Sequence, residues 1–271
     1  MEFLRYLFYG FISGCAELFP ISGQAHQILL QKLFGWDTAK PFCNLLVHLA
    51  ILASVYVSCR GLFVSLKRQQ LTAARRSTYH RKHSYDLNLI KTVIVPMVIG
   101  QILLFAATKN GISTALLIIF MMINGMILLI PEYMRQGNKD ASSMSGFDGI
   151  ALGILTAISV FPGIARNGLI TSYSLSRGAD RKNALNWALI LTIPALVLLC
   201  CFDIANIFMI GWGIGSFVDF LLCLVSAIGA FAGGYLAVLG LNFLVANSNF
   251  SVFAFYSWGF ALFYFIIYLI A

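Results

Sequence analysis

Two long apolar stretches of the chain are each interrupted by a proline with charged residues close by. The first break centres on Pro20 and lies between Glu17 and His26, and the second centres on Pro162 and is followed by Arg166. The two breaks are about half the chain apart, as expected of a duplicated membrane domain. Paired hydrophobic segments interrupted by Pro or Gly in two halves of a chain predict a binding site near the bilayer midplane.

Composition supports a membrane protein. Hydrophobic residues make up 60% of the 271 residues and charged residues only 10%, whereas soluble domains average roughly 45–50% and about 25%. A chain of this length has room for roughly eight spans or partial spans of about 20 residues each. We therefore expect one integral membrane domain over 1–271, with repeat one at about 1–131 and repeat two at about 148–271.

The hydrophobic segments predict the order of helices. The first half has a segment at 3–16 with a return limb at 26–34, then spans at 42–66, 89–107 and 113–131; the second has 148–162 with a return limb at 168–176, then spans at 184–202, 216–236 and 250–271. The segments beside each break are too short to span separately, so they predict re-entrant helical hairpins. Because three spans follow each hairpin, the sequence predicts an all-α, polytopic membrane fold of two inverted-topology repeats.

Basic residues orient this topology. The loops 67–88, 132–147 and 177–183 are rich in Lys and Arg and lie on one side, which is cytoplasmic by the positive-inside rule. Both termini then lie outside, and the two hairpins enter from opposite faces so that their tips meet. Topology and anionic lipid headgroups account for the net charge of +8, and we expect no nucleic-acid partner.

The charged residues at the breaks are the main candidates for a functional site. A charge near the bilayer centre costs roughly 2.5–3.5 kcal/mol, so Glu17 needs compensation. A structural interpretation is that Glu17 caps backbone amides of the second hairpin or pairs with Arg166. A functional one is that Glu17 holds a divalent cation or positions water, while His26 gives or takes a proton and Arg166 binds phosphate through two hydrogen bonds.

Small and polar residues around the breaks complete the predicted site. Ser22, Gly23 and Gly163 have amides that an anion can approach, and the return limbs present helix N-termini. This set favours phosphate or pyrophosphate as ligand. Further candidates are Ser13, Gln24, Thr156, Asn167 and His48, the last of which is either a core residue or a residue facing the site.

The break residues resemble the bacitracin-resistance type of undecaprenyl pyrophosphate phosphatases. Matches to the two motifs of that family are Glu17, Pro20, Ser22 and His26 in the first and Pro162, Gly163, Arg166 and Gly168 in the second. The chain departs from the family pattern at Ser13, which replaces the first Glu, at Gly23, which replaces a Ser, and at Ala165 and Asn167, which replace the serines flanking the Arg.

The resemblance implies an undecaprenyl-diphosphatase of the bacterial cell membrane. Such an enzyme hydrolyses undecaprenyl diphosphate to undecaprenyl phosphate and phosphate, which recycles the carrier lipid for cell-wall synthesis and confers bacitracin resistance. In the family, the Glu pair helps to bind a divalent cation (Mg or Ca), the Ser or His attacks or relays protons, and the Arg binds the diphosphate. By this resemblance Glu17, Ser22 and His26 are catalytic residues. We expect no organic cofactor, and the sequence leaves open whether the protein forms a homodimer.

Two alternatives remain. The replaced motif positions suit a transporter or flippase of polyprenyl phosphate or another anion on the same scaffold, with hydrolysis lost. The other membrane lipid phosphatase class has a Pro-Ser-Gly-His signature that resembles Ser22-Gly23, but it requires a histidine downstream of a Ser-Arg pair, which Ser176-Arg177 lacks.

Overall fold

The computed structural model describes residues 1–36, 40–73, 87–108, 111–133, 137, 144–247 and 250–270. Most of the basic loop 67–88, on which the predicted orientation depends, lies outside the described residues. Every regular element within them is helical. The helices are α1 (Glu2–Leu18), α2 (Gly23–Leu33), α3 (Pro41–Ser58), α4 (Arg60–Ala73), α5 (Leu87–Thr108), α6 (Thr114–Leu129), η1 (Ile130–Tyr133), α7 (Gly146–Ile158), α8 (Arg166–Ser176), α9 (Arg181–Ile210), α10 (Phe217–Asn247) and α11 (Ser251–Ile270).

Six of the described helices are long and apolar enough to cross a membrane, which confirms the all-α polytopic fold. The candidate spans are Pro41–Ser58, Leu89–Ala107, Thr114–Tyr133, Arg181–Ile210, Phe217–Leu244 and Ser251–Leu269. They overlap the six spans predicted from the sequence, although several of their ends differ. The inverted relation of the two halves stays a prediction.

The first span is shorter than predicted. It ends at Ser58 rather than continuing to residue 66, and α4 begins after Cys59. The hydroxyls of Ser54 and Ser58 donate to the backbone carbonyls of Ile51 and Ser54, a contact that bends helices. The 18 residues of α3 rise about 27 Å, close to the thickness of about 30 Å of the hydrocarbon core.

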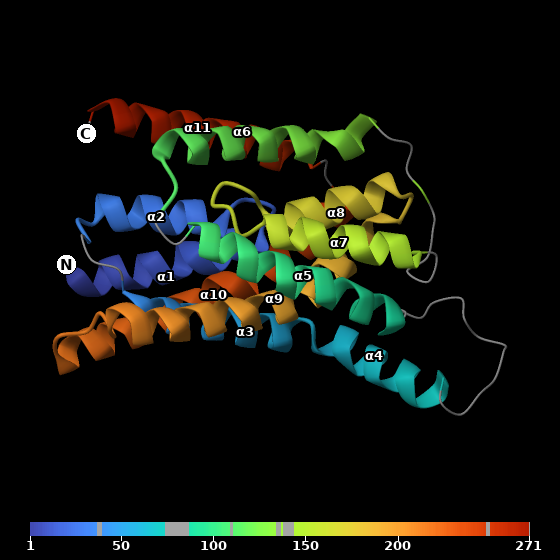
Figure 1. Ribbon diagram of the computed structural model, residues 1–271, viewed down its shortest axis with the longest axis horizontal. Coiled ribbons are helices and arrows are strands. Elements are labelled where there is room, and N and C mark those ends of the chain that lie inside the picture. Colours follow the sequence, from blue (N-terminus) through green and yellow to red (C-terminus); the bar gives the residue numbers. More distant parts are fainter. Residues whose placement is uncertain are drawn as a thin grey trace.

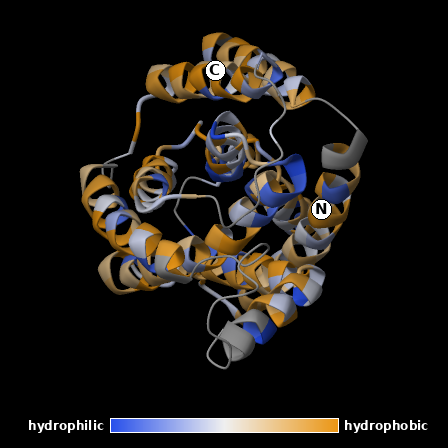
Figure 2. Cartoon of the chain, turned by 90° about the vertical axis from the view of Figure 1, so that its right-hand side faces the viewer, coloured by the Kyte–Doolittle hydropathy of each residue, from blue (hydrophilic) through white to orange (hydrophobic). Residues whose placement is uncertain are grey.

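The helices beside each break form two short hairpins. The return limbs α2 and α8 have 11 residues each and rise only about 17 Å, so neither crosses a bilayer. Figure 1 shows α1 and α2 on the side of the N-terminus, α7 and α8 on the opposite side, and the breaks of both hairpins near the middle. Figure 2 shows hydrophobic residues over the peripheral helices, as expected of surfaces that face lipid.

Glycines allow the first hairpin to pack closely against α10. A side chain at Gly10 would overlap the backbone oxygen of Ser226, and one at Gly233 would overlap that of Phe11. The hydroxyl of Ser226 donates across the same contact to the backbone oxygen of Tyr6 at 2.7 Å. Close backbone approach at small residues is a common means of helix association in membranes, and here it fixes α1, whose last turn carries Glu17.

The second hairpin is fixed where it begins by a buried carboxylate. Asp148 forms a capping box with Ser145 at the start of α7, and it accepts hydrogen bonds from Tyr173 Oη at 2.7 Å and Arg177 Nε at 2.6 Å. Burial alone would raise the pKa of Asp148, but the hydrogen bonds of Ser145, Tyr173 and Arg177 outweigh it and lower the pKa to about 2. The group lies outside the six spans and ties the start of α7 to the end of α8.

We predict that Gly10→Ala destabilises the protein and that Gly259→Ala does not. The new methyl group at position 10 overlaps backbone atoms of α10, whereas position 259 on α11 has no neighbouring atom within 4 Å. Overpacking should lower the free energy of unfolding by about 1–3 kcal/mol, while alanine on an open helix face should leave it unchanged or raise it by up to about 1 kcal/mol. Thermal unfolding of both variants in detergent measures the difference, and equal midpoints would contradict the close packing.

We also predict that Asp148 stabilises the protein in a pH-dependent way. Because its pKa is lower in the folded protein than the value of about 3.9 in unfolded chains, its contribution is present above pH about 4 and is lost as the pH falls toward 2. The wild type should therefore unfold at a higher temperature than Asp148→Asn at pH 6, and the gap should narrow between pH 4 and 2. A gap that stays constant over this range would contradict the assignment.

Candidate functional site

The tips of the two hairpins are joined by a direct hydrogen bond, which confirms that they meet. Ser22 caps α2, where its Oγ accepts from the Ala25 amide at 3.4 Å, and the same oxygen accepts from the amide of Gly163 at 2.8 Å. Gly163 has a φ of +107°, and a side chain there would lie 2.8 Å from the backbone oxygen of Leu117. Glycine is therefore required at the point where the second break reaches Ser22.

Glu17 and Arg166 form a buried ion pair across the same junction. Arg166 Nη2 lies 2.9 Å from Glu17 Oε1, and the two side chains are only 5% and 8% exposed. Glu17 is in the last turn of α1 and Arg166 is the first residue of α8, so each hairpin supplies one charge. A charge in this apolar setting persists only when it is paired, and the predicted proximity of the two residues is confirmed.

The free oxygen of Glu17 points toward the start of α2. A β-carbon built at Gly23 would overlap Glu17 Oε2. Position 23 therefore provides the space that the carboxylate occupies.

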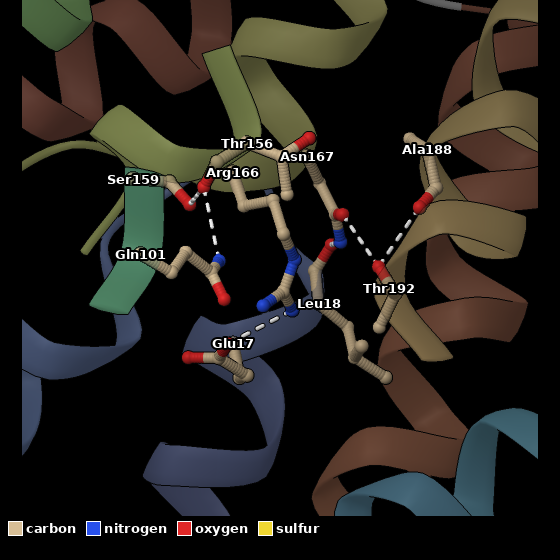
Figure 3. Close-up of polar contacts among 9 residues, drawn as sticks. All are labelled: Glu17, Leu18, Gln101, Thr156, Ser159, Arg166, Asn167, Ala188 and Thr192. Carbon is tan, nitrogen blue, oxygen red and sulfur yellow. Dashed lines mark hydrogen bonds and ion pairs between the residues drawn. The ribbon is translucent and has the colours of Figure 1, made fainter. Parts of the chain in front are cut away.

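Two buried asparagines hold the breaks together. Asn124 on α6 accepts from the Ala165 amide at 2.9 Å and donates to the backbone oxygen of Pro20 at 3.4 Å, so it contacts both breaks. Asn167 donates to the backbone oxygen of Leu18 at 2.7 Å and accepts from Thr192 Oγ1 at 2.8 Å (Figure 3). We predicted Asn167 as a diphosphate ligand. In the structure its side chain binds a backbone carbonyl and a hydroxyl group instead. Asn124 was missed, although it is a lone amide in an apolar span.

The ring of His26 faces α11. Its Nδ1 lies 2.7 Å from the backbone oxygen of Ser22 and its Nε2 lies 2.7 Å from Tyr256 Oη. Since a carbonyl only accepts, Nδ1 carries the proton and Nε2 accepts from the tyrosine. The ring also stacks on Phe260, with the centroids 3.9 Å apart. His26 thus binds the backbone of Ser22 through its Nδ1–H. Its predicted role in proton transfer stays a prediction.

Three of the further candidates have partners of their own. The hydroxyls of Ser13 and Thr156 donate to carbonyls one turn earlier in their own helices, those of Tyr9 and Leu152. His48 on α3 pairs through Nδ1 with the carboxylate of Asp203 on α9, and both are buried. Of these three side chains, only that of His48 joins two helices, and none of the three lines the cavity between the hairpins that is described next.

A small cavity lies between the two hairpins. Its volume is about 20 Å³, and its walls include Glu17, Arg166, Ser22, Gly23 and Gln24 from the predicted set. Besides apolar residues, the structure adds two polar residues that sequence analysis missed, Gln101 on α5 and Ser159 at the end of α7. Gln101 stands in an apolar span, and a lone amide at membrane depth could have signalled it. The cavity thus combines a carboxylate, a guanidinium, two side-chain amides and two hydroxyls.

The donors of this cavity suit an oxyanion. Arg166 offers a guanidinium whose Nε is buried and, among the described residues, has no hydrogen-bond partner. The hydroxyl oxygen of Ser22 accepts two amide hydrogens, so its own proton is left to donate. A planar guanidinium can bind two phosphate oxygens at once, so these donors match the phosphate or pyrophosphate ligand expected from the sequence, which stays a prediction.

Comparison with known proteins places this chain in a family. The model of the family described as "Bacitracin resistance protein BacA" matches residues 6–263. Three proteins called undecaprenyl-diphosphatase are similar over nearly their full length: those of Thermosipho melanesiensis (30% identity, 91% of this chain and 92% of the relative), Treponema denticola (29%, 94% of each) and Methanobrevibacter smithii (26%, 95% of each). With its six apolar spans, this chain is a multi-pass inner-membrane protein that belongs to the bacitracin resistance protein BacA family.

Proposed function

We propose that this chain hydrolyses undecaprenyl diphosphate to undecaprenyl phosphate and inorganic phosphate. The observation that carries the proposal is the buried Glu17–Arg166 pair in a cavity wall at the junction of two re-entrant hairpins. Membership of a family whose relatives are called undecaprenyl-diphosphatase supports the same reaction. Recycling of the carrier lipid for cell-wall synthesis would then be the physiological role.

Substrate binding begins, in this proposal, with an exchange of partners at Arg166. Within the described part of the chain, the Arg166 guanidinium makes a single hydrogen bond, from Nη2 to Glu17 Oε1, and a diphosphate brings several oxygens that compete for it. A bidentate contact with phosphate is stronger than the single hydrogen bond that it replaces. The incoming diphosphate therefore draws Arg166 away and leaves the Glu17 carboxylate free in the cavity between the hairpins.

Glu17 then acts as the general base. The freed carboxylate accepts a proton from a water molecule as the water oxygen attacks the terminal phosphorus. The bond from that phosphorus to the bridging oxygen breaks, and its electron pair leaves with undecaprenyl phosphate. Arg166 and the hydroxyl of Ser22 stabilise the charge that develops on the phosphoryl oxygens, while His26 holds the Ser22 backbone in place.

A divalent cation fits this site only together with the substrate. Within the described residues there is no group of three or more His, Cys, Asp or Glu side chains that could hold a metal ion. Glu17 is the one carboxylate in the cavity wall, and Mg²⁺ commonly binds through one or two carboxylates plus substrate phosphates. We propose that Glu17 and the diphosphate hold the cation, which would neutralise phosphate charge.

The prenyl chain would lie on the apolar surface beside the first hairpin. A groove of about 540 Å³ runs between α1 and α10, and it is lined by apolar side chains that include Phe8, Phe11 and Ile228. Glu17 follows Phe11 on the same helix by six residues, a rise of about 9 Å. The groove and Glu17 thus lie along the same helix, and we propose that the groove receives part of the prenyl chain.

We predict that Arg166→Lys lowers hydrolysis by a factor on the order of 10² or more, because lysine keeps the charge but loses the planar fork. Glu17→Gln should be similarly damaging, since a positioned base contributes 10²–10⁴-fold. The measurement is phosphate release from undecaprenyl diphosphate by purified protein, with and without Mg²⁺ or Ca²⁺.

Arg177→Lys is the matched control. It makes the same exchange at the other end of α8, where the side chain is half exposed and pairs with Asp148, so activity should stay at the wild-type level. Full hydrolysis by both Arg166→Lys and Glu17→Gln, or tight binding of the diphosphate without phosphate release by the wild type, would contradict the proposed function.

A further inference from the structure

Gln101 is a buried amide in the middle of a membrane span. It lies on α5, a helix that is otherwise largely apolar, and is only 1% exposed. Placing an amide there is unfavourable unless its polar atoms are bound. Gln101 satisfies only half of this requirement, because its Oε1 is buried and has no hydrogen-bond partner among the described residues.

The orientation of the amide is fixed by α7. Gln101 Nε2 donates to the backbone oxygen of Thr156 at 3.1 Å, and Ser159 Oγ donates to the same oxygen at 2.6 Å. Turning the amide over would place Oε1 against this carbonyl, and two acceptors cannot bind each other. The packing of α5 on α7 therefore presents Oε1, and not Nε2, to the opposite side.

On that opposite side lie the two charges of the site. Figure 3 shows the amide oxygen of Gln101 pointing away from Thr156 and toward Glu17 and Arg166. All three residues line the same cavity, whose volume of about 20 Å³ meets the space of roughly 10–15 Å³ that one water molecule needs. An acceptor oxygen repels the oxygens of a phosphate, but it suits the hydrogen of a water molecule.

We propose that Gln101 positions the water molecule that attacks the diphosphate, an inference that rests on the proposed function. One hydrogen of the water is donated to Gln101 Oε1 and the other to the Glu17 carboxylate. These two bonds direct an oxygen lone pair at the terminal phosphorus. On attack, Glu17 takes its proton, the new P–O bond forms, the bond to the bridging oxygen breaks, and the hydrogen bound by Gln101 stays on the released phosphate.

The test compares Gln101→Met with Gln27→Met. Methionine has nearly the size and shape of glutamine but cannot orient water, so Gln101→Met should lower kcat on the order of 10-fold to 10²-fold, with KM within about twofold of wild type. Gln27 is also buried but is not part of the cavity wall, and Gln27→Met should keep the wild-type kcat. The assay is steady-state phosphate release from undecaprenyl diphosphate at several Mg²⁺ concentrations.

Gln101→Glu separates water positioning from a purely structural role. A protonated carboxyl group can donate to the Thr156 carbonyl oxygen through its hydroxyl and still accept from water through its own carbonyl. An ionised carboxylate has no proton to donate, so the Thr156 oxygen repels it. The activity of Gln101→Glu relative to wild type should therefore rise as the pH is lowered. The same ratio for Gln101→Met should stay flat.

Distinct outcomes overturn the inference. A wild-type kcat in Gln101→Met would remove the role of Gln101 and leave the proposed function standing. An increase in KM alone, or a kcat that recovers fully at high Mg²⁺, would also rule out water positioning by Gln101, because the residue would then bind substrate or metal. A wild type that releases no phosphate would overturn the proposed function and this inference together.

Discussion

The arrangement of this protein depends on how the backbone ends at two helix breaks are satisfied inside a membrane. A broken helix at bilayer depth exposes amides and carbonyls that lipid cannot bind, so protein groups must bind them. Here each break supplies hydrogen-bond partners to the other. Ser22 of the first accepts the Gly163 amide of the second, and Asn124 contacts both. Each hairpin thus depends on the other for these hydrogen bonds, and the candidate site lies where the two breaks meet.

The same constraint explains why the site carries one charge of each sign. A lone carboxylate or guanidinium at the junction would be strongly unfavourable, whereas the Glu17–Arg166 pair is net neutral. A pair held by one hydrogen bond can still be separated by a ligand that offers Arg166 a better partner. The structural and functional interpretations of Glu17 are therefore compatible: the contact that stabilises the free protein is the one that a diphosphate would replace.

The sequence predicted the parts of the molecule that depend on local pattern. The lengths of the hydrophobic segments predicted the spans. The prolines flanked by charged residues predicted the hairpins and the proximity of Glu17 and Arg166. It did not predict that α3 ends at Ser58, near which the hydroxyls of Ser54 and Ser58 bind carbonyls of their own helix. It also missed Gln101 and the orientation of His26, since these depend on which atoms of α7 and α11 lie opposite. A single polar residue in an apolar span signals a partner, but its identity is set by packing between distant segments.

Because position 23 is a glycine, the effect of a substitution there depends on whether the Glu17–Arg166 pair is still intact, and the reverse also holds. The Glu17 carboxylate lies where a side chain at position 23 would begin, so any larger residue there must first turn Glu17 into another rotamer and away from Arg166. Position 23 and the ion pair are thus epistatic: a change at one alters the consequence of a change at the other, although 149 positions separate the two charged residues in sequence.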